Sequence, residues 1–91
     1  MSLSFSQSDE LELTLKKLAK KNKPLYEATL KKMEEIINRD PESINFYKNL
    51  RNDLSNYKRV HVYKHYVLFF KFYPDKNKVY FQKIRHHDEA Y

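Results

Sequence analysis

Cysteine and glycine are both absent from this chain of 91 residues. Without cysteine there are no disulfides, zinc–thiolate sites or cysteine nucleophiles. Without glycine there is no phosphate-binding loop of the P-loop or dinucleotide type, because both loops need glycine backbone. Tight turns must use other residues that tolerate a left-handed backbone, and we expect Asn52, Asn56 and Asn77 in that role.

Long apolar runs are absent as well. No segment approaches membrane-spanning length and no signal peptide is evident, so we expect a cytoplasmic protein. Hydrophobic residues make up 41% and charged residues 33%, which is typical of one soluble globular domain at this length. The net charge of +6 favours a polyanionic partner, which is a nucleic acid, an anionic membrane surface or an acidic protein.

Apolar spacing in the first half predicts two amphipathic helices. Ser8 or Asp9 can cap the first helix. Its expected apolar stripe is Leu11, Leu15 and Leu18. The second helix has Pro24 in its first turn and should end near Asn38. Its expected apolar stripe is Tyr26, Leu30, Met33 and Ile37.

The second half has the two-residue period of β-strands. It predicts strands over 59–63, 66–73 and 78–85, after a short first strand over 3–5. Residues 74–77 are a hairpin turn signal, and residues 40–57 form either a short helix or a loop. The predicted fold is α+β, with two N-terminal helices packed on one face of a small antiparallel sheet.

Alternation along these strands gathers basic side chains on the face away from the helices. That set is Arg59, His61, Lys71, Lys83, Arg85 and His87. Placing Lys83 outside also places Val79 and Phe81 outside. Either a bulge in the last strand or an apolar patch covered by a partner resolves this conflict, and the sequence leaves both open. Such a face suits RNA, because cations neutralise phosphates and aromatic rings stack on bases; the alternative is a solvated face with scattered charges.

All four histidines lie in the last third, at positions 61, 65, 86 and 87. Two histidines can act as base and acid at one phosphodiester, where RNA supplies its 2′-hydroxyl as nucleophile. A lysine or arginine can stabilise the charge on the phosphorane. Neighbouring His86 and His87 point apart in a strand and have no evident third ligand, so we expect no metal and no other cofactor.

Three segments together carry a family resemblance: residues 56–62 (NYKRVHV), 66–71 (YVLFFK) and 87–91 (HDEAY). They resemble the RelE/ParE toxin superfamily, most closely its YafQ-type mRNA interferases. The resemblance implies one domain over residues 1–91, with two helices on an antiparallel sheet. It also implies a type II toxin that cuts mRNA on the ribosome and is inhibited by a cognate antitoxin.

The resemblance also implies roles for single residues. The catalytic set is His61, His65, His87 and Arg85. The substrate-binding set is Lys48, Lys58, Arg59, Lys71, Lys83 and Tyr91. His87 matches the terminal catalytic histidine, Tyr91 matches an aromatic that stacks on a base, and Arg85 matches a phosphate-contacting arginine.

Two departures from the family pattern leave alternatives open. His65 stands where the family has an aspartate, and a histidine can replace that carboxylate as a base. Val67 stands where RelE has an arginine. One alternative is therefore a catalytically degenerate protein that binds RNA or an antitoxin. Another is a ParE-like gyrase inhibitor, which would have no need of clustered histidines.

Overall fold

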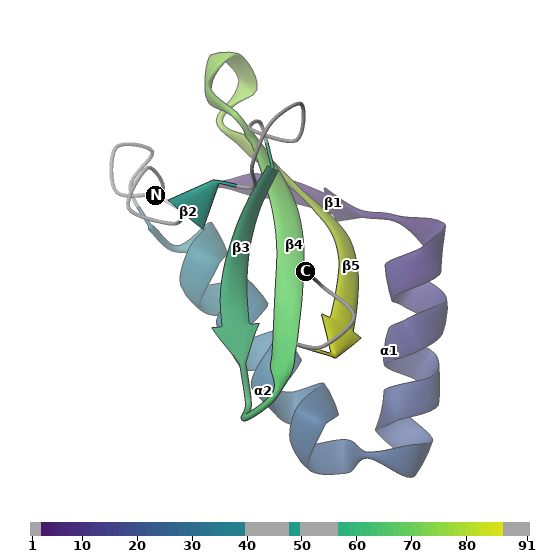
Figure 1. Cartoon of the computed structure of the whole chain (residues 1–91). Helices are drawn as coiled ribbons and strands as arrows, with labels where there is room; N and C mark the ends of the chain where they lie inside the picture. The colour runs from purple at the N-terminus through teal and green to yellow at the C-terminus, as the bar shows by residue number, and fades with distance from the viewer. Residues whose placement is uncertain (1–2, 40–47, 50–56, 87–91) are drawn as a thin grey trace.

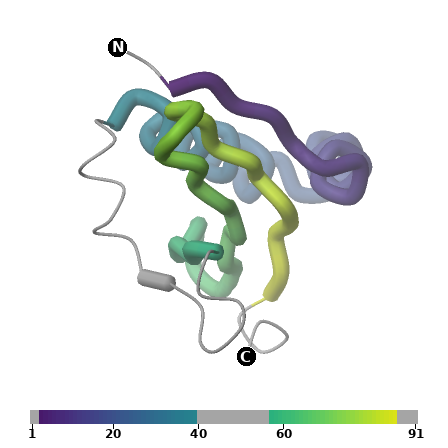
Figure 2. The backbone as a smooth tube through the Cα atoms, turned by 90° about the horizontal axis from the view of Figure 1, so that it is seen from above, coloured from purple at the N-terminus to yellow at the C-terminus, as the bar shows by residue number. Residues whose placement is uncertain are grey.

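The computed structural model describes residues 3–39, 48–49 and 57–86. In chain order the elements are β1 (Ser4–Gln7), α1 (Asp9–Lys21), α2 (Lys23–Ile37), β2 (Lys48–Asn49), β3 (Tyr57–Val62), β4 (Tyr66–Tyr73), a short 3-10 turn (Pro74–Lys76) and β5 (Lys78–His86). The strands form one sheet in the order β1-β5-β4-β3-β2. Both helices lie on the same side of this sheet, as Figures 1 and 2 show.

The α+β prediction is confirmed, with one correction to the sheet. β1 runs parallel to β5, so the sheet is mixed, whereas the other strand pairs are antiparallel as expected. A strand of four residues carries no sequence signal for the direction of its partner. In the described part of the chain, no helix is long and apolar enough to cross a membrane.

α1 follows the prediction closely. The Ser8 side chain caps it by accepting a hydrogen bond from the backbone N–H of Leu11, at 3.0 Å. Leu11 and Leu15 are buried, and Leu18 packs against the same core. The core continues into α2 and the sheet, where Phe70 and Phe81 are its largest fully buried side chains. Removal of this apolar surface from water is the main stabilising contribution to the fold.

The predicted stripe of α2 is confirmed at Met33, and at Tyr26 and Ile37, which are partly buried against the same core; the helix ends at Ile37 as expected. Its buried residues are Leu25, Thr29, Met33 and Ile36, whereas Leu30 is 38% exposed. Thr29 is buried because its hydroxyl donates to the Leu25 carbonyl at 2.8 Å, which satisfies the polar group inside the core.

Turns without glycine use two left-handed residues in the described part of the chain. Asn77, between β4 and β5, has φ 47°, which confirms its predicted turn role. Tyr63, between β3 and β4, has φ 58° and was not predicted. Asn52 and Asn56 lie outside the described residues, as does nearly all of the irregular segment 40–57.

Candidate functional site

A bulge in β5 resolves the conflict that the sequence left open. Phe69 pairs with Lys83, but the next residue, Phe70, pairs with Phe81, so Gln82 is the extra residue in β5. Val79 and Phe81 before the bulge and Ile84 after it are all buried in the core under the helices. The bulge alternative is therefore confirmed, and Lys83 and Arg85 lie on the opposite face.

We call that opposite side the cationic face, defined by Arg59, His61, Lys71, Lys83 and Arg85. The strand register orders it in rows across the sheet. His61, Val67 and Arg85 form one row, and Arg59, Phe69 and Lys83 form the next. In Figure 1 this face of β3, β4 and β5 is toward the viewer, with α2 behind.

The lysines of the cationic face lie over aromatic rings. The Nζ of Lys71 lies 5.5 Å from the centre of the Tyr57 ring and 5.0 Å from that of Tyr73. The Nζ of Lys83 lies 5.3 Å from the ring centre of Phe69, which is buried. These cation–π contacts hold the positive charges in place above the sheet.

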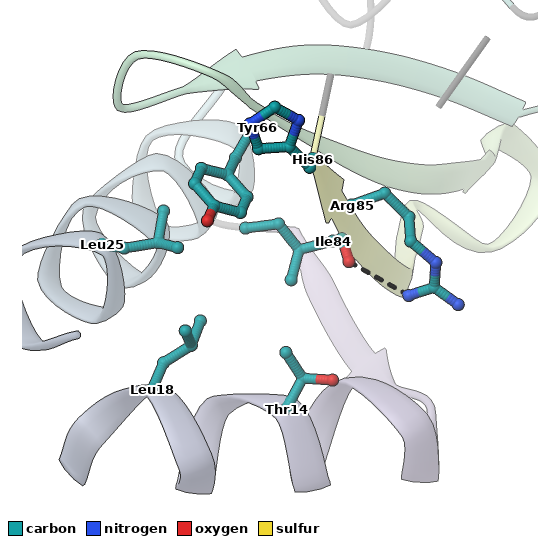
Figure 3. Close-up of a pocket in the computed structure, with 7 residues that line it drawn as sticks. All are labelled: Thr14, Leu18, Leu25, Tyr66, Ile84, Arg85 and His86. Atoms are coloured by element: carbon teal, nitrogen blue, oxygen red, sulfur yellow. Dashed lines mark hydrogen bonds between the residues drawn. The ribbon is translucent and has the colours of Figure 1, made fainter. Parts of the chain in front are cut away.

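Arg85 lies at the border of the cationic face and contacts α1. Its guanidinium forms an ion pair with Glu10 in the first turn of that helix. It also donates to the Ile84 carbonyl at 3.1 Å. Figure 3 shows the guanidinium directed away from Tyr66 and His86. The predicted phosphate-binding arginine therefore has an acidic partner within the same chain.

His65 and His86 are brought together at the end of the sheet. Their ring centres are 6.0 Å apart, and the Tyr66 ring meets His86 edge-on at 5.3 Å. The predicted base His65 thus lies in the turn after β3, outside the row of His61 and Arg85. His86 was not among the predicted catalytic residues, because its place beside His65 depends on the bulge and the turn.

A cavity of about 480 Å³ opens beneath this histidine pair. Figure 3 shows its lining, which comes from both helices and the ends of β4 and β5. The lining residues are Thr14, Leu18, Leu25, Tyr66, Ile84, Arg85 and His86. Leu18, Leu25 and Ile84 form the apolar part of this wall, and the other lining residues carry polar groups. The cavity lies beside the cationic face rather than within it.

The remaining predicted site residues are Lys58, Lys48, His87 and Tyr91. Lys58 lies on the helix side of β3 and is 7% exposed, which corrects its predicted RNA contact. Burial lowers the pKa of its ammonium group below the ordinary value. Lys48 pairs with Arg59 through the β2–β3 ladder, so its position in the sheet lies in the row of Arg59, Phe69 and Lys83. His87 and Tyr91 lie outside the described residues, so their predicted roles stay predictions.

No known protein-family profile matches the sequence. A protein of Methanocaldococcus jannaschii named "Putative toxin RelE4" is 42% identical over 81 residues, which are 89% of this chain and 82% of that protein. The chain belongs to the RelE toxin family. A second relative of this RelE-family chain, an uncharacterised protein of Methanosarcina mazei, is 40% identical over 82 residues, 90% of this chain and 91% of that protein.

Solved structures share the fold at low sequence identity. A toxin–antitoxin complex of Mycobacterium tuberculosis, RelBE2, matches with a TM-score of 0.73 and 16% identity, over 94% of this RelE-family chain and 92% of that chain. A metal-bound toxin of Helicobacter pylori matches with a TM-score of 0.64 and 20% identity, over 98% and 99% of the two chains. These matches confirm the RelE-like fold, and membership of the YafQ branch stays a prediction.

Proposed function

We propose that this RelE-family protein is the toxin of a toxin–antitoxin pair and cleaves mRNA as a metal-independent endoribonuclease in the cytoplasm. The cationic face is the observation that carries the proposal. It places His61 and Arg85 in one row, with Arg59 and Lys83 in the next. Two strand spacings separate His61 from Arg85, which is about 10 Å between backbones, and Val67 lies between them.

The chemistry follows from these residue types. His61 takes the proton of the 2′-hydroxyl, and that oxygen attacks the adjacent phosphorus. Arg85 and Lys83 stabilise the negative charge that develops on the phosphorane oxygens. A second histidine protonates the leaving 5′-oxygen, and we assign this role to His87 from its family position. The products carry a 2′,3′-cyclic phosphate and a 5′-hydroxyl. We assign the base to His61 rather than to His65, because the register places His61 in the Arg85 row.

Binding of mRNA rests on charge and stacking. Arg59, Lys71 and Lys83 offer positive charges in reach of a single strand, and Tyr57 and Tyr73 flank Lys71 on the same surface. Phosphate neutralisation releases counterions, so affinity for RNA falls steeply as salt rises. A flat salt response would count against the cationic face as the binding surface.

An antitoxin is the proposed partner that keeps the protein inactive. The M. tuberculosis neighbour was solved as a toxin–antitoxin complex, which supports this partner. The net charge of +6 also suits an acidic segment that folds on binding. By occupying the cationic face, such a segment would exclude mRNA.

Translation in vitro with purified protein, followed by primer extension on the message, tests the function. We expect cuts from the wild-type chain and at least about a hundredfold slower cutting by His61→Ala, because one acid or base contributes about that much. Lys31→Ala, at an exposed position of α2, is the control and should cut like wild type. Circular dichroism establishes that each variant is folded.

The outcomes separate the candidate functions. Absence of cuts by the wild-type chain on translated message would favour the degenerate RNA- or antitoxin-binding alternative. Undiminished cutting by His61→Ala would remove His61 as the base while leaving the nuclease function intact. Inhibition of gyrase without RNA cleavage would favour the ParE-like alternative.

A further inference from the structure

His65 and His86 approach each other from two different elements. His65 is an exposed residue in the turn between β3 and β4, and His86 is the half-buried last residue of β5. Their ring centres are 6.0 Å apart. Imidazole nitrogen is the commonest protein ligand for transition metals, so two rings at this separation raise the question of a shared ion.

The backbone fixes the position of this pair. His86 is paired with Tyr66 in the β4–β5 ladder, and Tyr66 directly follows His65. The Tyr66 ring also meets His86 edge-on at 5.3 Å. Figure 3 shows the rings of Tyr66 and His86 next to each other above the cavity, with the His86 imidazole on the outer side. Strand pairing thus positions His86, and His65 directly precedes the residue that is paired with it; a partner placed before the ligand binds lowers the entropy cost of binding.

The separation suits one metal ion between the rings. A metal–imidazole bond of about 2.1 Å puts the ring centre about 3.2 Å from the ion. Two rings on a tetrahedral ion then have centres about 5.2 Å apart, and wider angles extend this to about 6.4 Å. The observed 6.0 Å lies inside that interval.

The arginine next to His86 is directed away from the histidine pair. Arg85 precedes His86, but its guanidinium forms an ion pair with Glu10 and points away from the imidazole in Figure 3. No cluster of three histidine, aspartate or glutamate side chains that suits a metal occurs among residues 3–39, 48–49 and 57–86. Among these residues no third protein ligand joins the pair, so the ion would complete its coordination with water.

We propose that His65 and His86 together bind a divalent transition-metal ion of the Zn²⁺, Ni²⁺ or Cu²⁺ class, with water in the remaining positions. Along the sequence the only histidine next to His86 is His87, which lies outside the described residues. The fold supplies a different partner, His65, which is distant in sequence. The site is independent of RNA cleavage, so its failure leaves the proposed nuclease untouched.

Calorimetric titration of the untagged full chain with ZnCl₂ tests the site. We expect one ion per chain, and we expect His65→Gln and His86→Gln each to weaken Zn²⁺ binding at least about tenfold, or about 1.4 kcal/mol. His61→Gln removes the same side chain from the cationic face and should bind Zn²⁺ within about twofold of wild type. Because His65 is exposed, His65→Gln should fold normally even if His86→Gln is destabilised.

Electron paramagnetic resonance with Cu²⁺ identifies the ligands directly. The wild-type chain should show hyperfine coupling to two imidazole nitrogens, and each ligand variant should show coupling to one. Zn²⁺ binding by His65→Gln with wild-type affinity would overturn the proposal, as would the absence of Zn²⁺ binding to the wild-type chain.

Discussion

The side-chain hydroxyl of Ser8 donates a hydrogen bond to the backbone carbonyl of Gln82, the extra residue in the bulge of β5. The same oxygen accepts from the backbone N–H of Leu11 and so caps α1. The Ser8 N–H also donates to the Phe81 carbonyl, at 3.0 Å. Since the bulge directs Lys83 and Arg85 to the cationic face, one serine links the start of α1 to the geometry of the site.

Ser8→Ala should therefore remove two interactions at once. The lost helix cap costs about 1 kcal/mol, and the lost bond to Gln82 costs about another 1 kcal/mol. We expect the free energy of unfolding, measured with urea, to fall by about 2 kcal/mol in total. Ser6→Ala, on the neighbouring strand β1, should change it by less than about 0.5 kcal/mol. Equal losses for both variants would show that Ser8 has no special role at the bulge.

In the proposed function, RNA competes with Glu10 for Arg85. Their ion pair is partly exposed, so its contribution is at most about 1 kcal/mol. Glu10→Gln frees the guanidinium for phosphate, and we expect RNA to bind about two- to fivefold more tightly at low salt.

The matched control is Glu12→Gln, in the same first turn of α1. It removes the same charge, but Glu12 faces Lys16, with Nζ and Oε1 4.0 Å apart. RNA affinity, measured by fluorescence anisotropy, should change less in this variant than in Glu10→Gln. An equal increase in RNA affinity in both variants would mean that the net charge of the protein, and not the release of Arg85 from Glu10, controls RNA binding.

Hydrophobic spacing predicted the fold well because burial of apolar surface determines which helix and strand faces meet. It predicted both helices, the three long strands and the left-handed turn at Asn77. In α2 it was wrong at Leu30, which is exposed, and it missed Thr29, which is buried. Hydrophobicity ranks Thr29 as polar, and the hydrogen bond to Leu25 that permits its burial is visible only in three dimensions.

The site was harder to predict, because it depends on local irregularities. Alternation alone placed Lys83 and Phe81 on one face, and only the bulge at Gln82 separates them. Lys58 follows the expected alternation with Val60 and Val62 onto the helix side, so the family resemblance rather than the pattern misplaced it. The pairing of His65 with His86 depends on the turn at Tyr63, which no residue type in that turn predicts.

Buried Lys58 should give the stability of the protein a measurable pH dependence. Burial lowers the pKa of its ammonium group from 10.5. Between that lowered pKa and 10.5 the unfolded chain binds more protons than the folded chain, so the free energy of unfolding rises with pH in this window. Relative to Lys58→Met, wild type should gain stability as pH increases toward 10.5. Urea unfolding at several pH values measures this, with Lys31→Met as the exposed control. Parallel curves for wild type and Lys58→Met would contradict the linkage.

Tyr63 lies in the turn between β3 and β4 with φ 58°, a left-handed backbone that a bulky side chain disfavours. The clash of its Cβ with the backbone costs about 1–2 kcal/mol. The side chain is 53% exposed, so little packing is lost when it is removed. We expect Tyr63→Gly to raise the free energy of unfolding by about 0.5–1 kcal/mol, after the higher chain entropy of glycine is included.

The control is Lys64→Gly, at the next position. Lys64 does not have a positive φ, so this change should instead lower the free energy of unfolding by about 0.5–1 kcal/mol. A loss of stability in both variants would show that the Tyr63 ring contributes more to the turn than its backbone conformation costs.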